Sequence, residues 1–257
     1  MSLTKLILKF AAPVPKIREF EHYLFIGPHP DDIEIGAGAT VSRLVSLGKK
    51  VSFLICLDGR FGFENAPKGT TPDEMASIRR KESIEAAKIL GVTDVRFLDL
   101  SDGGLYSKAD LYDGIMRAVG EVGADIIFAP DPDTGAECHE DHLNVGNCAK
   151  NIAFFAPFDD ITKAHGAKAS EVKAIGFYMT AKPNRYFGTS KVHRVKQIEA
   201  ILQHQSQYPA DCAAFKSVKT YLALRSIDFG LRSFKVRAEG FRVLGRTHMH
   251  CLPEAGK

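Results

Sequence analysis

Residues 23–32 read Tyr-Leu-Phe-Ile-Gly-Pro-His-Pro-Asp-Asp, and this stretch decides the fold class. Its first half, residues 23–27, is an apolar run typical of a short strand that is buried on both faces. The turn that follows, residues 29–32, brings one imidazole and two carboxylates together. Neighbouring carboxylates repel each other, so holding them in one turn costs free energy unless a cation binds between them. We therefore expect a strand that ends at a cation site.

The first two-thirds of the chain alternates apolar runs with segments of helical spacing. Strands that alternate with helices form parallel pairs with right-handed crossovers. The sequence therefore predicts an α/β fold, a Rossmann-like, doubly wound and mostly parallel sheet with helices on both faces. The expected strands are 23–27, 51–56, 95–98 and 125–129, and the expected helices are 36–47, 72–90, 107 to 120 or 123, and 142–155.

The last third of the chain has weaker patterns. We expect a strand at 173–179, a helix at 192–204 and strands within 229–241, where apolar residues alternate. No linker-like stretch separates this part from the rest. We therefore expect residues 1–257 to form a single domain, with the last third as an extension of the same sheet.

A second polar cluster, His-Glu-Asp-His at residues 139–142, comes after the fourth expected strand. In doubly wound sheets, ligands bind beyond the carboxyl ends of the strands where the strand order reverses. The first and fourth strands flank that point in the Rossmann order. We therefore expect residues 29–32 and 139–142 to meet at one site.

The residue types in these clusters are those of a catalytic zinc site, which takes three protein ligands and leaves one position for water. His29, one of Asp31 and Asp32, and one histidine of residues 139–142 would supply the three ligands. The remaining carboxylate could accept a proton from water, and the remaining histidine could donate one or stabilise an oxyanion. The clusters therefore predict metal-assisted hydrolysis of an amide or an ester.

Composition excludes several other classes of protein. The net charge of +3 is too small to indicate a nucleic-acid partner or an anionic membrane surface. No apolar run is long enough to cross a bilayer, so we expect no membrane partner. The five cysteines show no close-paired spacing, which favours a reduced, cytoplasmic setting.

Other interpretations of the same residues stay open at this point. A His-Pro-Asp-Asp turn can simply cap a helix. Gly36-Ala37-Gly38 resembles part of a dinucleotide fingerprint, but the third glycine is missing and the acidic loop before it would repel a pyrophosphate. A Rossmann oxidoreductase and a non-catalytic carbohydrate-binding protein are therefore the alternatives.

Three further side chains have a simpler interpretation. Glu34 fits the first turn of a helix, where a negative charge is favourable, better than it fits a metal site. His248 and His250 fit a solvated tail.

Four motifs resemble those of one enzyme family. They are Pro28-His29-Pro30-Asp31-Asp32, the Arg-x-x-Glu helix at Arg79-Arg80-Lys81-Glu82, His139-Glu140-Asp141-His142, and a later helix that ends at His204-Gln205-Ser206-Gln207. By these motifs the chain resembles the PIG-L/LmbE-like family of metal-dependent N-acetylglucosamine deacetylases over most of its length. Within that family it looks nearest to the archaeal-type diacetylchitobiose deacetylases.

The resemblance implies one zinc ion per chain, held by His29, Asp32 and His142. Iron(II) or another divalent ion is an alternative, because mixed imidazole and carboxylate ligands do not select sharply. It also implies a small amino-sugar substrate and suggests a homo-oligomer.

The same resemblance implies roles for three further residues. Asp31 would be the general base that accepts a proton from water. His139 would stabilise the tetrahedral intermediate or protonate the leaving amine. Arg79 would bind a hydroxyl or phosphate of the substrate, unless it is an exposed helix charge and Arg80 makes that contact. The implied reaction is removal of an acetyl group from an N-acetylated amino sugar.

Overall fold

The computed structural model describes residues 3–252, which are built around a seven-stranded sheet of order β3-β2-β1-β4-β5-β7-β6. The strands from β3 to β5 in this order run parallel, whereas β7 is antiparallel to both β5 and β6. The predicted Rossmann-like fold is therefore confirmed, and strands from the last third extend the same sheet. The strands are β1 (His22–Gly27), β2 (Lys50–Leu57), β3 (Asp94–Leu100), β4 (Ile126–Pro130), β5 (Ala174–Tyr178), β6 (Arg185–Gly188) and β7 (Ala238–Gly245).

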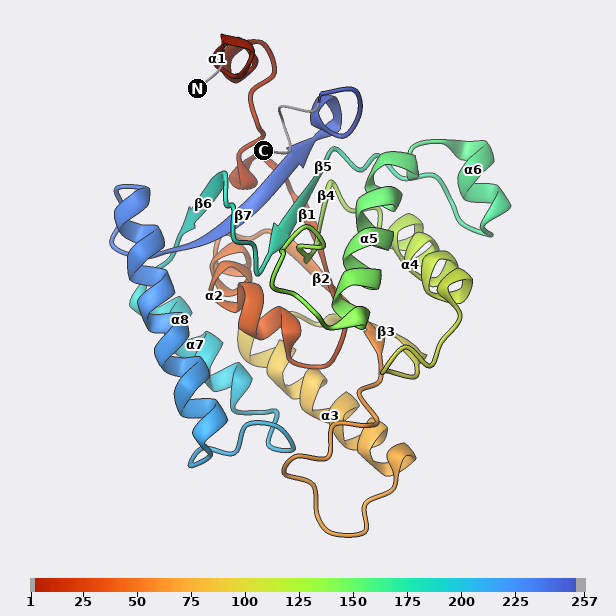
Figure 1. The fold of residues 1–257 in the computed structure, drawn as a ribbon, viewed down its shortest axis with the longest axis vertical. Helices are drawn as coiled ribbons and strands as arrows, with labels where there is room; N and C mark the ends of the chain where they lie inside the picture. Colours follow the sequence, from red (N-terminus) through yellow and green to blue (C-terminus); the bar gives the residue numbers. More distant parts are fainter. Residues whose placement is uncertain (1–2, 253–257) are drawn as a thin grey trace.

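Helices cover both faces of the sheet. Figure 1 shows α2, α3, α7 and α8 on one side and α4, α5 and α6 on the other. Two short 3-10 helices, η1 (Ile17–Glu19) and η2 (Arg246–His248), lie near the chain ends. The α-helices are α1 (Leu3–Ala11), α2 (Asp32–Ser46), α3 (Pro72–Leu90), α4 (Lys108–Val122), α5 (Glu140–Phe155), α6 (Asp159–Ala164), α7 (Lys191–Ile201) and α8 (Ala213–Arg232).

The central strand β1 contributes to two separate hydrophobic cores. Tyr23 and Phe25 belong to the core beneath α2 and α3, whereas Leu24 and Ile26 belong to the core beneath α4 and α5. All four side chains are fully buried. Because neighbouring side chains of a strand point to opposite faces, a strand covered on both sides has no polar position, which explains the continuous apolar run.

Local capping fixes where α3 begins and ends. The Thr71 hydroxyl accepts a hydrogen bond from the Glu74 N–H at 3.3 Å, and the Glu74 carboxylate accepts one from the Thr71 N–H at 2.8 Å. Pro72 occupies the first turn, where its missing N–H costs nothing. Gly91 ends the helix with φ of 88°, a conformation that glycine adopts readily.

The structure corrects the prediction for residues 229–241. These residues are not a pair of strands: α8 continues to Arg232, and only Ala238 onward forms strand β7. The buried apolar residues of α8 include Phe215, Leu222 and Phe229, which are seven residues apart and lie on one helix face. The alternation of apolar residues in 229–241 arises because the range includes both the end of α8 and the start of β7. Two predicted helices also begin earlier than expected, α2 at Asp32 and α5 at Glu140.

The expectation for His248 was also wrong. This side chain is 8% exposed, and its Nε2 atom lies 2.8 Å from the carbonyl oxygen of Ala12. Its Nδ1 atom accepts the Gly245 N–H at 3.1 Å. His248 therefore ties the end of β7 to the segment after α1, a contact between distant parts of the chain. His250 is exposed, as expected.

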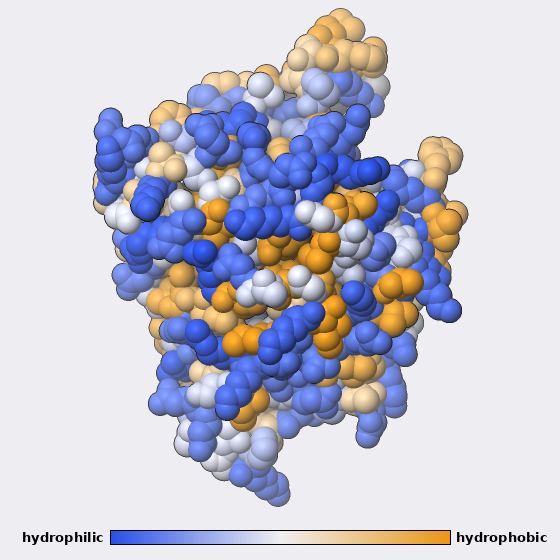
Figure 2. Space-filling model, turned by 180° about the vertical axis from the view of Figure 1, so that it is seen from behind, coloured by the Kyte–Doolittle hydropathy of each residue, from blue (hydrophilic) through white to orange (hydrophobic). Residues whose placement is uncertain are grey.

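Helix α1 stands away from the body of the molecule (Figure 1). Its exposed apolar side chains are Leu3, Leu6, Ile7 and Phe10. In the opposite view they form an apolar lobe at the top of the molecule (Figure 2). Within residues 3–252, no helix combines the length and the apolar character needed to cross a membrane.

Gly36 lies where the ring of Tyr178 approaches the backbone of α2. A Cβ atom at this position would be 2.3 Å from Cδ2 of Tyr178. The ring cannot move aside easily, because it is fully buried and its hydroxyl donates to the Ile26 carbonyl at 2.8 Å. We expect Gly36→Ala to lower the free energy of unfolding by about 1–3 kcal/mol, although alanine is the better helix former.

Urea denaturation measures this difference. Gly135→Ala is the control, because a Cβ atom there meets nothing within 4 Å. It should change the free energy of unfolding by less than about 0.5 kcal/mol. Equal stability of the two variants would show that the Tyr178 ring moves aside for the added Cβ atom at little cost in free energy.

Candidate active site

The two polar clusters lie at the carboxyl ends of neighbouring strands. Strands β1 and β4 pair in parallel, with Leu24 opposite Ile127. The turn after β1 leads into α2, which begins at Asp32, and the loop after β4 leads into α5, which begins at Glu140. Residues 29–32 and 139–142, which are far apart in sequence, therefore meet at one edge of the sheet.

His29, Asp32 and His142 converge on one point. Each offers a donor atom, and these atoms all lie within 4.8 Å of one another. Nδ1 of His29 is 3.2 Å from Oδ2 of Asp32, and Nε2 of His142 is 3.3 Å from Oδ1 of the same carboxylate. His29 and Asp32 are buried, and the His142 side chain is only 13% exposed. The structure thus brings together the three residues that the sequence predicts as ligands.

Both histidines place their other ring nitrogen against a second carboxylate. Nε2 of His29 is 3.0 Å from Oδ2 of Asp141, and Nδ1 of His142 is 3.3 Å from Oε2 of Glu137. The hydrogen bond from His29 to Asp141 orients that ring, as a carboxylate does for histidines that bind metals. Nδ1 of His142 lies near Glu137 but makes no hydrogen bond. Two imidazoles and one carboxylate form a donor set that fits a divalent cation such as zinc.

A second group of donors, His29, His139 and Asp141, also lies within 4.8 Å. The Asp141 oxygens already accept hydrogen bonds from the backbone N–H groups of Gly103 at 2.8 Å and Gly104 at 3.0 Å. Asp141 therefore serves better as an anchor for His29 and for the loop after β3 than as a ligand. The sequence predicts no role for Asp141, although it lies between the two histidines of its motif.

The charges of this cluster favour a bound cation. Burial alone would lower the pKa of His29, but its hydrogen bonds to Asp141 and Asp32 raise it to about 10. Burial alone would raise the pKa of Asp32, but the nearby His142 and His29 hold it well below its usual range. The carboxylates thus stay ionised and stabilise positive charge beside them. A bound cation would have to displace the proton of His29, because imidazole binds a metal only in its neutral form.

Asp31 lies in the turn between β1 and α2 in a strained backbone conformation, with φ of 111°. Nη2 of Arg79 donates to its carboxylate at 3.0 Å and to the Pro30 carbonyl at 2.6 Å, which holds the turn in place. Burial raises the pKa of Asp31 to about 6, against the lowering effect of Arg79. A carboxylate tuned toward neutral pH in this way is suited to accept a proton.

Arg79 is not an exposed helix charge. It is 5% exposed, and Nη1 also donates to the Gly59 carbonyl at 3.3 Å. Arg80 has a 46% exposed side chain that pairs with Asp99 at the surface. The Arg79 guanidinium is thus engaged by Asp31 and by two backbone carbonyls. Its contact with substrate stays a prediction.

His139 lies on the open side of the cluster. It precedes α5 as its N-terminal cap residue, and its side chain is 51% exposed. Its ring centre is 4.9 Å from that of His29 and 5.0 Å from that of His142. Burial and the neighbouring histidines lower its pKa. A neutral, accessible imidazole therefore lies beside the candidate metal ligands.

A second feature that the sequence does not predict is the buried pair of Glu34 and His204. Glu34 lies in the first turn of α2, as expected, but is only 1% exposed. Its Oε1 atom is 3.7 Å from Nε2 of His204, which is fully buried. The two residues are 170 positions apart, so no local pattern could have indicated the contact.

Comparison with known proteins agrees with this geometry. Residues 24–153, which contain both polar clusters, match the PIG-L family model, described as GlcNAc-PI de-N-acetylase. The chain belongs to the PIG-L family. This membership explains why the two clusters occur together on a Rossmann-like sheet.

Two PIG-L relatives illustrate the range of similarity. The diacetylchitobiose deacetylase of Thermococcus kodakarensis is 30% identical over 256 residues, covering 98% of this chain and 93% of the relative. The 1D-myo-inositol 2-acetamido-2-deoxy-alpha-D-glucopyranoside deacetylase of Kineococcus radiotolerans is 28% identical over 202 residues, covering 68% of this chain and 55% of the relative.

A solved structure shows the same fold. The N,N'-diacetylchitobiose deacetylase from Pyrococcus horikoshii, complexed with its inhibitor MPG, superposes with a TM-score of 0.84 and 27% identity. The alignment covers 96% of this chain and 92% of that chain. The similarity therefore includes the last third of the sequence, where motifs are weakest.

Proposed function

We propose that this PIG-L family member is a zinc-dependent N-deacetylase that removes the acetyl group from an amino sugar of the N-acetylglucosamine type. The observation that carries the proposal is the convergence of His29, Asp32 and His142 on one point, next to the buried carboxylate of Asp31. The Thermococcus and Kineococcus relatives and the Pyrococcus structure are named as deacetylases.

The residues have distinct tasks in this reaction. A divalent cation held by His29, Asp32 and His142 would polarise the acetyl carbonyl and make water more acidic. Asp31 accepts the proton of the attacking water as general base. His139 stabilises the tetrahedral intermediate or passes a proton to the leaving amine. The C–N bond breaks, water supplies the new oxygen of acetate, and the sugar keeps a free amine.

The similarity to the Thermococcus and Pyrococcus proteins makes N,N'-diacetylchitobiose the substrate that we propose to test first. The purified protein loaded with zinc should release acetate from this disaccharide and leave one free amine for each acetate. N-Acetylglucosamine serves as the second substrate, to measure what the additional sugar contributes. If neither compound releases acetate, the proposed activity is wrong.

The alternatives raised by the sequence have no support in the structure. Gly36 and Gly38, which resembled a dinucleotide fingerprint, face the side chains of Tyr178 and Gln197, so that added Cβ atoms would lie 2.3 Å and 2.9 Å from them. These glycines therefore permit close packing of α2 and do not form a phosphate loop. A homo-oligomer, a single domain and a cytoplasmic location stay predictions.

We expect Arg79 to contribute to the free energy of unfolding as well as to the geometry of the site. Arg79→Met would leave the buried carboxylate of Asp31 without its charged partner. We expect the free energy of unfolding to fall by about 3 kcal/mol, measured by urea denaturation at neutral pH. Arg80→Met, one position along the same helix, breaks only a surface pair and should cost less than about 1 kcal/mol. Equal losses in the two variants would contradict the buried pairing.

A further inference from the structure

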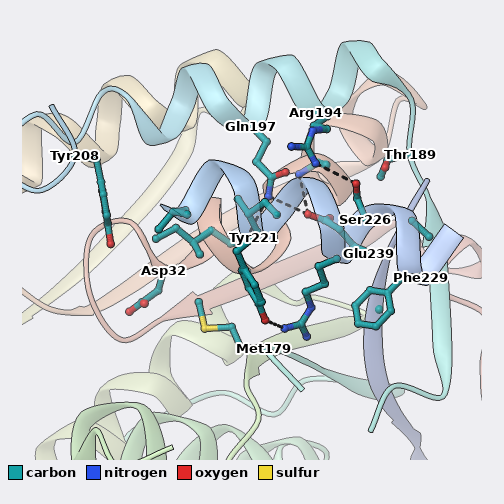
Figure 3. Close-up of a pocket in the computed structure, with 18 residues that line it drawn as sticks. Asp32, Met179, Thr189, Arg194, Gln197, Tyr208, Tyr221, Ser226, Phe229 and Glu239 are labelled. Carbon is teal, nitrogen blue, oxygen red and sulfur yellow. Dashed lines mark hydrogen bonds between the residues drawn. The ribbon is translucent and has the colours of Figure 1, made fainter. Parts of the chain in front are cut away.

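A cavity of about 430 Å³ opens beside the candidate metal centre. It lies between α2, α7, α8 and β7, and it does not include the histidines of the site. Figure 3 shows Asp32 and Tyr208 at one end of the cavity, and Ser226 and Phe229 toward the other. The mechanism described above makes no use of this space.

The cavity begins at a candidate metal ligand and leads away from it. Asp32, Ile35, Gly36 and Ala39 all line it, and their spacing places them on one face of α2. At 1.5 Å per residue, the distance from Asp32 to Ala39 along the helix is roughly 10 Å. Because Asp32 is the first residue of α2, the cavity runs from the reaction centre along the helix.

The walls of the cavity are largely apolar. Ile35 and Ala39 come from α2, and Val218, Leu222 and Phe229 come from α8. Tyr208, Tyr221 and Arg225 also line the cavity. A sugar ring needs hydrogen-bond partners for its hydroxyl groups, and the apolar walls do not supply them. They suit a hydrocarbon chain, whose transfer from water is favourable in proportion to the area buried.

The polar side chains at the far end already have hydrogen-bond partners within the protein. Arg225 donates to the Thr180 carbonyl at 2.8 Å and to the hydroxyl of Tyr221. Glu239 accepts the N–H of Thr40 and, at 3.0 Å, the amide of Gln197. Arg194 donates to the hydroxyl of Ser226 at 3.0 Å. Because these charges have partners within the protein, the far end does not require a charged ligand.

We propose that this cavity binds the acyl chain of the substrate, so that the enzyme hydrolyses glucosamine amides of medium-length linear fatty acids as well as acetamides. This inference rests on the proposed deacetylase function. The reacting carbonyl carbon must lie next to Asp32, and the acyl chain is bonded directly to that carbon. The group on the anomeric carbon is separated from it by the amide nitrogen and two ring carbons. The chain that enters a cavity starting at Asp32 is therefore the acyl chain.

The reaction balances in the same way as deacetylation. The amide C–N bond breaks and a C–O bond forms with water. The fatty acid leaves as its carboxylate, and the sugar keeps the amine. The sugar ring stays on the open side of the site, near His139, whose side chain is 51% exposed. No oxidant, reductant or second substrate is needed.

The test compares N-hexanoylglucosamine with N-acetylglucosamine, using the zinc-loaded protein of residues 1–257 and fluorescamine detection of the free amine. Each buried methylene should raise kcat/KM about fourfold until the chain fills the cavity. We expect kcat/KM for the hexanoyl compound to exceed that for the acetyl compound by at least about tenfold, allowing for imperfect burial.

Two variants on α8 test whether the acyl chain of the substrate lies in the cavity. Val218→Trp places an indole in the cavity and should lower the ratio of hexanoyl to acetyl kcat/KM below one. Leu224→Trp is the control on the same helix, because Leu224 is 64% exposed and does not line the cavity, and it should leave the ratio as in the native protein. The ratio compares two substrates of one variant, so a partial loss of folded protein does not affect it.

The outcomes separate this inference from the proposed function. If acetyl is removed but the hexanoyl compound is hydrolysed more slowly, the cavity does not bind the acyl chain and the deacetylase proposal stands. A preference for hexanoyl that Val218→Trp leaves unchanged would place the chain elsewhere and overturn the inference. If neither compound reacts, the deacetylase proposal is wrong and this inference fails with it.

Discussion

Asp31→Asn should lower kcat for acetate release at least about a hundredfold, the usual loss when a general base is removed, while the protein keeps its metal. Asparagine preserves the shape of the side chain, and its carbonyl oxygen can still accept the hydrogen bond that Arg79 donates at 3.0 Å. It cannot accept a proton from water at neutral pH. The expected loss is therefore in the chemical step rather than in folding or metal binding.

Steady-state kinetics and metal analysis of the same preparation measure this result. Asp99→Asn is a matched control, because Asp99 also has a positive φ, of 54°, and pairs with the neighbouring arginine of α3, Arg80. That pair is exposed, with side chains that are 46% and 60% accessible, so kcat should be unchanged. Native kcat in Asp31→Asn would remove Asp31 from the role of general base.

His142→Ala should reduce bound zinc to well below one ion per chain and abolish deacetylation. Removing one of three protein ligands costs more than removing a residue that merely orients a ligand, which itself typically lowers metal affinity 10- to 100-fold. Asp32→Ala should have the same effect, because both ring nitrogens that face the centre lie within 3.3 Å of its carboxylate. Metal content after dialysis against a weak chelator measures the loss.

His139→Ala distinguishes the two donor groups of the structure. It should keep its zinc, because His139 belongs only to the group whose carboxylate, Asp141, is already hydrogen-bonded to Gly103 and Gly104. Activity should still fall, because His139 is the residue proposed to stabilise the tetrahedral intermediate or to protonate the leaving amine. Loss of zinc from His139→Ala with retention in His142→Ala would place the metal in the other group.

Helix and strand positions in the first two-thirds could be predicted because they depend on local patterns. The apolar run before His29 is continuous because β1 is covered on both faces, and Thr71 with Glu74 closes a cap within four residues. The strand prediction for residues 229–241 was wrong because a helix ends and a strand begins within this range. No local pattern marks that boundary.

The sequence by itself determined the α/β sheet, the two polar clusters and, through the rule for strand order, their meeting at one edge. The tertiary structure alone decided that Asp141 anchors His29, that Arg79 lies behind Asp31, and that an apolar cavity starts at Asp32. The reason is physical. Secondary structure and motif chemistry arise from neighbours in the chain, whereas burial, ion pairing and cavities depend on side chains that come together only when distant segments pack.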